Sequence, residues 1–313
     1  MKYRRMGRTG LKVSAVSLGG WLTYGRSVED RTAEDILHAA IDHGINFIDV
    51  ADIYAKGESE RVVGAALKDF RRSDLVISSK VYWPMSDDPN DRGLSRKHIM
   101  ESVEKSLRRL QTDYLDIYFC HRWDEHAPLD ETLRAMDDLV RQGKVLYWGT
   151  SMWSGEQLDQ AVEVADRFNA YAPVVEQPRY NLIHREIETS GVQQSCLNHG
   201  MGLVVWSPLA QGLLTGKYNA GVPEDSRAAT SDWLAADLTE QNLQRTREFT
   251  TIAAELDLAP GQLALAWALH QPGISSVITG ATKLSHVHSN AAAADVALSD
   301  EVLARLDALF PAG

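Results

Sequence analysis

Four residues of different chemical type follow apolar segments of this sequence: Asp49, Tyr54, Lys80 and His121. A tyrosine phenol has an ordinary pKa of about 10, which a neighbouring ammonium group lowers. Lys80 can supply this cation, and a carboxylate such as Asp49 would keep a buried ammonium group charged. A histidine beside the phenol can hydrogen-bond a carbonyl oxygen. Such a set would polarise a carbonyl group and protonate its oxygen by general acid catalysis.

Each of these side chains also has an ordinary structural interpretation. Asp49 can cap a helix, and Tyr54 can be a half-buried aromatic residue. Lys80 can end a strand in solvent, and His121 can be a hydrogen-bonded core residue. The functional interpretation therefore depends on a fold that brings the four side chains together.

Short apolar segments alternate with amphipathic helical segments from about residue 15 to residue 295. This alternation is typical of a parallel sheet whose strands are joined by helices. We expect eight strands, at residues 16–18, 46–49, 75–79, 115–119, 145–149, 174–176, 202–206 and 276–279. They predict a (β/α)8 TIM barrel, in which the loops after the strands form the active face. The four candidate residues all stand at or just after the ends of expected strands.

Two further features modify the expected barrel. Residues 3–6 and 11–14 flank a glycine-containing turn and predict an N-terminal β-hairpin that caps the bottom of the barrel. A long segment, from residue 206 to residue 276, separates the seventh and eighth expected strands and contains two helical stretches. Loops of this length within a compact domain are usually functional. We expect residues 1–313 to form one barrel domain.

The composition indicates a folded protein that does not bind nucleic acid. The chain has 313 residues, of which 44% are hydrophobic and 24% charged, as is ordinary for a protein with a large core. Its formal net charge of −11 repels phosphate backbones. It has no long apolar run and no apolar leader, so we expect a cytoplasmic protein without a membrane segment. Cys120 and Cys196 are expected to be reduced, structural thiols.

Six sequence motifs resemble those of aldo-keto reductases, especially the branch that contains the potassium-channel β subunits. They are FIDVADIYAKGESE, ISSK, DYLDIYFCH, YWGTS, EQPRYN and WSPLAQGLLTGKY, and they follow one another in the family's order. The resemblance covers nearly the whole chain. It implies reduction of aldehydes or ketones with a nicotinamide cofactor by a catalytic tetrad, in which Tyr54 is the general acid. The tetrad consists of Asp49, Tyr54, Lys80 and His121.

The resemblance also implies an extended NADP(H) molecule across the mouth of the barrel. Ser151 and Gln177 would hold the nicotinamide carboxamide, and Trp206 would pack near its ring, with Trp21 as a further contact. The residues implied for the pyrophosphate are Ser207, Pro208, Leu209, Gln211, Gly212, Leu214, Lys217 and Arg227. Those implied for the adenosine and its 2′-phosphate are Gly280, Thr282, Lys283, His286 and Asn290.

Several positions depart from the family's pattern. Ser289 stands before Asn290 where the family usually has Glu, and His286 replaces a usual polar partner, which alters the adenine contacts. Lys283 suits a phosphate as a point charge, which favours NADPH over NADH. Channel β subunits tend to have Asn at the position of His121, and this difference favours a catalytic reductase.

Large aromatic residues in the expected loops predict an apolar pocket for the organic part of a carbonyl substrate. The residues expected to bind this small molecule are Tyr24, Trp83, Arg122 and Trp123. No metal site is expected, since the histidine pairs lack a carboxylate or thiolate at metal-site spacing. These pairs are His38 with His43 and His286 with His288.

Two other functions remain open from the sequence. One is a redox-sensing subunit that holds NADP(H) tightly and regulates a membrane partner, as the resemblance to channel β subunits suggests. The other is a barrel hydrolase or isomerase that uses Asp49 with Glu58 or Glu60 as acid and base. Turnover of simple aldehydes would argue against the first, and NADPH binding against the second. Assembly as a homo-oligomer is also left open.

Overall fold

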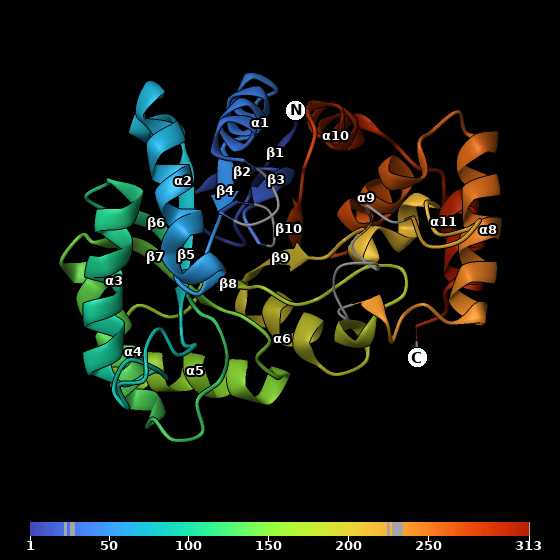
Figure 1. The fold of residues 1–313 in the computed structure, drawn as a ribbon. Helices are drawn as coiled ribbons and strands as arrows, with labels where there is room; N and C mark the ends of the chain where they lie inside the picture. The colour runs from blue at the N-terminus through green and yellow to red at the C-terminus, as the bar shows by residue number, and fades with distance from the viewer. Residues whose placement is uncertain (22–23, 26–28, 224–225, 227–233, 313) are drawn as a thin grey trace.

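A computed structural model describes residues 1–21, 24–25, 29–223, 226 and 234–312. Its centre is a closed barrel of parallel strands in the order β10-β3-β4-β5-β6-β7-β8-β9 (Figure 1). The strands are β3 (Val16–Gly19), β4 (Phe47–Asp49), β5 (Val76–Val81), β6 (Leu115–Cys120), β7 (Val145–Thr150), β8 (Val175–Glu176), β9 (Gly202–Trp206) and β10 (Ile274–Thr279). The predicted (β/α)8 barrel is confirmed, with strand ends shifted by one or two residues.

Helices surround the barrel (Figure 1). The α-helices are α1 (Asp30–Asp42), α2 (Glu58–Ala66), α3 (Arg96–Leu110), α4 (Leu129–Arg141), α5 (Gly155–Phe168), α6 (Val192–His199), α8 (Glu240–Glu255), α9 (Pro260–His270), α10 (Leu284–Ala292) and α11 (Asp300–Leu309). Short 3-10 helices are η1 (Tyr54–Gly57), η2 (Leu67–Asp69), η3 (Arg72–Asp74), η4 (Glu186–Glu188), η5 (Ala210–Thr215) and η7 (Ala293–Asp295). Polar residues cap several helix starts. The side chains of Ser95 and Ser154 accept hydrogen bonds from backbone N–H groups in the first turn, which have no partner within the helix.

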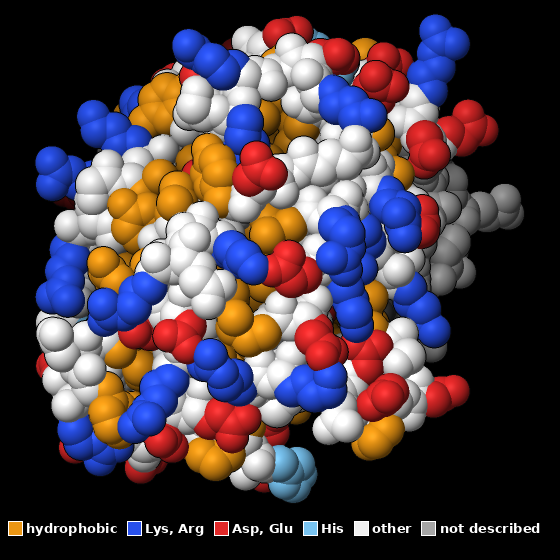
Figure 2. Space-filling view, turned by 90° about the vertical axis from the view of Figure 1, so that its left-hand side faces the viewer, with side chains coloured by type: hydrophobic (Ala, Val, Ile, Leu, Met, Phe, Trp, Pro, Cys, Tyr) orange, Lys and Arg blue, Asp and Glu red, His pale blue; other side chains and the backbone are white. Residues whose placement is uncertain are grey.

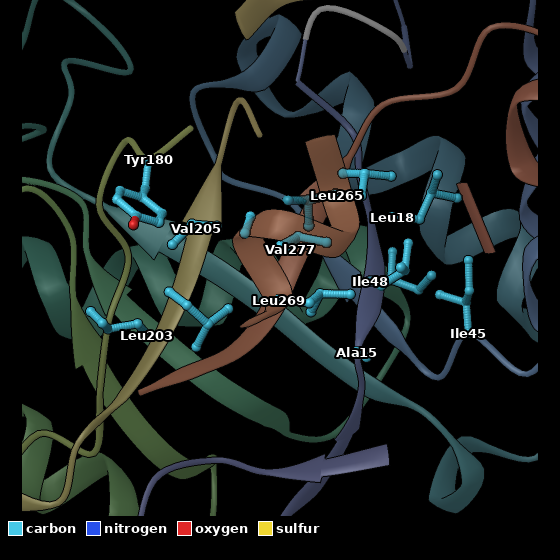
Figure 3. Packing of buried hydrophobic residues seen from close by; sticks show 14 of the residues in the cluster. Ala15, Leu18, Ile45, Ile48, Tyr180, Leu203, Val205, Leu265, Leu269 and Val277 are labelled. Carbon is cyan, nitrogen blue, oxygen red and sulfur yellow. The ribbon is translucent and has the colours of Figure 1, made fainter. Parts of the chain in front are cut away.

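The apolar residues form two layers because successive strand residues point to opposite faces. Between the strands and the helices, Val205 and Val277 pack near Leu265 and Leu269 of α9 (Figure 3). A second buried cluster fills the inside of the barrel with alternate strand residues. Its members are Met6, Val13, Phe47, Val76, Ile117, Phe119, Val175, Val204 and Ile278. The barrel interior is therefore a packed core rather than a channel.

The predicted N-terminal hairpin is confirmed and closes one end of the barrel. Strand β1 (Tyr3–Arg5) pairs antiparallel with β2 (Lys12–Ser14). The hairpin turn approaches the amino end of β9 so closely that a Cβ on Gly7, where φ is 53°, would lie 2.3 Å from the Gly200 carbonyl oxygen. This end holds structural contacts, and the opposite end is left for polar side chains.

The long segment between β9 and β10 contains η5, α8 and α9, so the two predicted helical stretches are present. Helices α8 and α11 contact each other at the edge of the molecule farthest from α3 (Figure 1). No helix in the described part of the chain is long and apolar enough to cross a membrane.

Acidic and basic side chains are interspersed on the face of the molecule shown in Figure 2. Around α3 and α4 they form ion pairs, as between Arg96 and Asp138 at 2.6 Å, and between Lys144 and Glu104. Exposed pairs of this kind contribute little to stability. The net negative charge is thus not gathered into one patch on this face.

Candidate active site

Three of the four candidate side chains come from neighbouring strands. Asp49 is the last residue of β4, Lys80 lies near the end of β5, and His121 directly follows β6. These strands are adjacent in the barrel, and Tyr54 begins the 3-10 turn η1 after β4. The structure therefore brings all four residues together at the carboxyl ends of the strands.

Lys80 forms the centre of this group. Its Nζ atom donates to Asp49 Oδ2 at 2.6 Å, to the Val50 carbonyl oxygen at 2.8 Å and to Tyr54 Oη at 3.2 Å. The Lys80 side chain is fully buried, which alone would lower its pKa. The charge of Asp49 and its hydrogen bond outweigh burial and raise the pKa of Lys80 above its ordinary value. The ammonium group is therefore charged at neutral pH.

The phenol of Tyr54 is subject to two opposing influences. Burial raises its pKa, and the charge of Lys80 lowers it, but burial is the larger effect. The pKa of Tyr54 is therefore raised overall, whereas we expected a net lowering by the lysine. A phenol of this kind keeps its proton at neutral pH, and Lys80 stands where it would stabilise the phenolate that remains after proton transfer.

His121 is buried beside Tyr54. The two rings are 5.9 Å apart and nearly perpendicular. Burial, followed by the charges of Lys80 and Arg122, lowers the pKa of His121 well below its ordinary value, so the imidazole is neutral. Its Nδ1 atom is buried and has no hydrogen-bond partner among the described residues. A neutral imidazole can donate one hydrogen bond to a substrate oxygen.

The turn that carries Tyr54 has an unusual backbone. Ala55, Lys56 and Gly57 all adopt positive φ angles, of 48°, 52° and 93°. Non-glycine residues rarely adopt this conformation, and they keep it only when the surroundings enforce it. A Cβ on Gly57 would lie 2.8 Å from Arg109 Cδ, so a larger residue there would also displace the Arg109 side chain.

A buried ion pair between two helices, which no sequence pattern predicted, holds this turn in place. Arg109 of α3 donates to Glu60 Oε2 at 2.5 Å, and Ser79 Oγ donates to Glu60 Oε1 at 2.6 Å. Glu60 is fully buried. The start of α2 is thereby fixed to α3 and to the strand residue that precedes Lys80.

Asp52 is a further buried acidic residue near Tyr54 that the sequence did not predict. It is 1% exposed, and neither of its carboxyl oxygens has a partner among the described residues. Burial and the nearby charge of Glu60 raise the pKa of Asp52 well above its ordinary value, which favours the neutral carboxyl. The only sequence signal for Asp52 is its position, two residues before Tyr54.

The residues expected around the nicotinamide are brought to the same place. Gln177 donates from Nε2 to Asp49 Oδ1 at 3.0 Å, and Ser151 Oγ donates to the Gln177 carbonyl oxygen at 2.9 Å. The rings of Trp21 and Trp206 lie 5.9 Å apart. Gln177 and Ser151 thus form the wall of the site next to Asp49, and the two tryptophan rings contact each other.

The backbone after β9 turns sharply in the segment expected to meet the pyrophosphate. Ser207, Ala210, Gln211 and Gly212 all have positive φ angles, and Gln211 Nε2 donates to Ser207 Oγ at 2.9 Å. Backbone N–H groups in such turns can converge on an anion. Side chains of Pro208 and Leu214 are buried and that of Leu209 is half-buried, so their backbone is the part a ligand would meet.

A basic corner is formed by Lys217, Lys283 and His286. Burial is the largest cause that lowers the pKa of His286, and the positive charges of Lys283 and Lys217 lower it further. Thr282 and Gly280 are exposed beside them, and Asn290 is buried. Arg227, the remaining residue implied for the cofactor, lies outside the described residues. The donor set in this corner and in the turn after β9 fits the phosphates of a dinucleotide.

Arg179, in the EQPRYN motif, links the segment before α8 to the barrel. It lies over the Trp206 ring at 5.8 Å and donates to Asp237 Oδ2 at 2.5 Å. His184 contacts the other oxygen of Asp237 at 2.9 Å. The segment before α8 is thereby fixed against the end of β8.

The expected substrate residues occupy different environments. Trp83 is 36% exposed, and its ring lies 6.3 Å from that of His121 and 5.5 Å from the Arg122 guanidinium carbon. Trp123 packs on Trp153 at 4.7 Å. Tyr24 is 1% exposed and belongs to the core. Trp83 and Arg122 are thus the members of this set that border the tetrad.

One histidine has acidic neighbours that its sequence spacing did not reveal. Ligand atoms of Glu34, His38 and Asp69 lie within 4.8 Å of one another on the surface. His38 Nε2 also contacts the Ala66 carbonyl oxygen at 3.2 Å. The group lies away from the tetrad.

Cys120 and Cys196 are both buried and free.

A hollow of about 570 Å³ lies at the hairpin end of the barrel, between Arg4, Leu197, Leu269 and Ser275. None of the four candidate residues lines it. In parallel barrels the reactive groups stand at the carboxyl ends of the strands, and the charged pair Asp49 and Lys80 lies there. The tetrad, and not this hollow, is therefore the candidate active site.

The fold and the site together define a (β/α)8-barrel protein with a buried Asp–Lys pair, a tyrosine and a neutral histidine at the carboxyl ends of its strands. The sequence model of the Aldo/keto reductase family matches residues 15–310, and the chain belongs to this family. Membership supports a general oxidoreductase role, and members of this family generally bind NAD(P)H.

Similar proteins fall in the branch that the motifs indicated. A probable voltage-gated potassium channel subunit beta of Arabidopsis thaliana is 45% identical over 302 residues, which are 95% of this chain and 92% of the relative. A protein of the same description from Oryza sativa subsp. japonica is 44% identical over 317 residues, or 99% of this chain and 96% of the relative. A putative subunit beta from Schizosaccharomyces pombe is 42% identical over 322 residues, or 98% and 93%. The predicted family and branch are confirmed.

Proposed function

We propose that this protein is an NADP(H)-dependent reductase of aldehydes or ketones, with Tyr54 as general acid. One observation carries the proposal: Lys80 Nζ contacts both Asp49 Oδ2 and Tyr54 Oη, at 2.6 Å and 3.2 Å. A charged ammonium held against a protonated phenol stabilises the phenolate that forms when the phenol gives up its proton.

The four side chains divide the work of reducing a carbonyl group. His121, neutral and buried, donates a hydrogen bond to the carbonyl oxygen and orients it toward Tyr54. Bound NADPH would supply the hydride to the carbonyl carbon. The oxygen then gains the proton of Tyr54, and Lys80 offsets the charge left on the phenolate. Asp49 keeps Lys80 charged and in position.

The same wall of the site is suited to hold the nicotinamide. Ser151 and Gln177 offer polar atoms beside Asp49, and Trp206 with Trp21 offers aromatic surface. The turn after β9, with Lys217, would take the pyrophosphate, and Lys283 would take the 2′-phosphate. The ammonium group of Lys283 favours NADPH over NADH.

Cofactor titration followed by an aldehyde panel tests the proposal. NADPH should quench tryptophan fluorescence through Trp21 and Trp206, and it should bind more tightly than NADH. Loss of the reduced-nicotinamide absorbance with simple aldehydes should then report turnover. A protein that binds neither dinucleotide, or binds NADPH but oxidises it with none of the aldehydes, would contradict the proposed reaction.

A channel-associated regulatory role is a second candidate, since the relatives described above are named channel subunits. Tight NADPH binding without turnover would favour it. The hydrolase alternative has less support, because Glu60 is engaged by Ser79 and Arg109, while Glu58 pairs with Arg61 on the surface.

A further inference from the structure

Arg122 is a half-buried cation at the edge of the tetrad. It follows His121 directly, and burial lowers the pKa of its guanidinium group. Its charge also lowers the pKa of Tyr54, which places the guanidinium within electrostatic reach of the reacting phenol. A partly desolvated charge at this point costs free energy unless a counter-charge is present.

No described residue forms an ion pair with Arg122. Among the described residues, it forms one hydrogen bond, from Nη1 to the His121 carbonyl oxygen at 2.5 Å. A guanidinium group has five N–H donors, so most of them are left for another partner. The remaining donors lie next to the site where a substrate would bind.

Glu176 is the carboxyl group that most affects Arg122, and it is engaged elsewhere. It accepts hydrogen bonds from Thr150 Oγ1 at 2.5 Å and from the Trp153 backbone N–H at 3.2 Å. Burial raises the pKa of Glu176 to about 7, so it is only partly ionised at neutral pH. It does not neutralise Arg122.

The guanidinium group of Arg122 lies over the ring of Trp83. The Arg122 guanidinium carbon lies 5.5 Å from the Trp83 ring centre, and the same ring lies 6.3 Å from His121. An arginine against an aromatic ring still offers donors in a planar fork that matches a carboxylate. A substrate lying along the Trp83 ring would thus place its carbonyl oxygen near Tyr54 and its carboxylate near Arg122.

We propose that the preferred substrates are aldehydes or ketones that carry a carboxylate, which Arg122 binds while the carbonyl group faces Tyr54. This inference rests on the proposed reductase function and names its substrate class. Arg122 acts as a specificity residue: it contacts the anionic group of the substrate, not the reacting carbonyl.

Two matched pairs of compounds, whose members differ in the carboxylate charge and one methyl group, test this. The flexible pair is succinic semialdehyde and its methyl ester, and the rigid pair is 4-carboxybenzaldehyde and its methyl ester. With NADPH, kcat/KM should be at least about tenfold higher for the acid in the flexible pair, mainly through a lower KM, as expected of a charge-assisted contact worth about 1.4 kcal/mol. In Arg122→Leu the ratio of acid to ester should fall to about one, and Arg122→Lys should retain part of it.

The matched control is Arg71→Leu, which removes the same charge from an exposed residue directly before η3. This variant should keep the acid-to-ester ratio of the wild type. Fluorescence titration with NADPH checks that each variant is folded. Equal kcat/KM for acid and ester in both pairs, or a preference that persists in Arg122→Leu, would overturn the inference.

Calorimetric binding in the presence of NADP⁺ separates this inference from the proposed function. It compares the affinities of acid and ester without any turnover. If no aldehyde is reduced, the proposed function fails, and tighter binding of the acid, lost in Arg122→Leu, still supports the site. Equal affinities of acid and ester would refute it even in an active enzyme.

Discussion

The side-chain amide of Gln177 donates to Asp49 Oδ1 at 3.0 Å, although the two residues are 128 positions apart in the sequence. The other donors to this carboxylate are Ser78, at 2.6 Å, and Lys80. Asp49 thus joins the residue expected to hold the nicotinamide to the ammonium group beside Tyr54. Cofactor binding and proton transfer would therefore both depend on the carboxylate of Asp49.

Replacement of Tyr54 by Phe should abolish most turnover. The variant loses the proton donor but keeps the ring, so kcat for aldehyde reduction should fall about 100- to 10,000-fold. NADPH affinity, measured by fluorescence titration, should hardly change. Tyr114→Phe removes a hydroxyl group at the start of β6, away from the tetrad, and should remain active. Activity of Tyr54→Phe within about tenfold of the wild type would show that another group donates the proton.

The buried pair of Asp49 and Lys80 should be strongly coupled in stability. Lys80→Met leaves a buried carboxylate without its cation, which should lower the free energy of unfolding by ~3–5 kcal/mol. The double variant Asp49→Asn/Lys80→Met removes both charges and should be more stable than Lys80→Met alone. Urea denaturation of the wild type, both single variants and the double variant gives the coupling energy. Simple addition of the two single effects would contradict the pairing.

Glu176 should make stability depend on pH. Burial raises its pKa from 4.5 to about 7, so the folded protein binds more protons than the unfolded chain between these pH values. The free energy of unfolding should therefore contain a contribution that is present below pH 4.5 and lost as the pH rises through 7.

Glu176→Gln removes this contribution because an amide does not titrate. Between acidic and neutral pH the wild type should lose on the order of 3 kcal/mol of unfolding free energy that the variant does not lose. The variant should therefore gain stability relative to the wild type as the pH rises. Chemical denaturation at several pH values measures it. A constant difference would mean that the pKa of Glu176 is the same in the folded and unfolded states.

Lys283 should discriminate between the two cofactors. Its exposed ammonium group stands in the basic corner with Lys217, where only the 2′-phosphate of NADPH would reach it. Lys283→Met should weaken NADPH binding about tenfold and leave NADH binding unchanged. Lys105→Met, on α3, controls for the loss of one surface charge. Equal weakening of both cofactors would place the 2′-phosphate elsewhere.

The sequence was sufficient to predict the barrel because strand and helix patterns differ in period. Runs such as Val76–Val81 and Leu115–Cys120 are buried on both faces, as expected for parallel strands. The convergence of Asp49, Lys80 and His121 then follows from strand order alone. Local patterning and one rule of barrel architecture therefore account for the tetrad.

Contacts between distant elements could not be predicted in this way. The pairing of Glu60 with Arg109 depends on how α2 packs against α3, and no local pattern encodes it. The net pKa shift of Tyr54 depends on how much water is excluded from the site, which requires coordinates. Tyr24 is a similar case, since a loop aromatic can equally face a ligand or the core.

The ring of strands closes by pairing β10 with β3, so that Val277 lies opposite Val16. Translation delivers β3 at the start and β10 only near the end of the chain. A nascent polypeptide that stops before β10 has every member of the tetrad but no enclosed barrel to exclude water from them. Catalytic competence should consequently arise late in biosynthesis, after the final strand has left the ribosome.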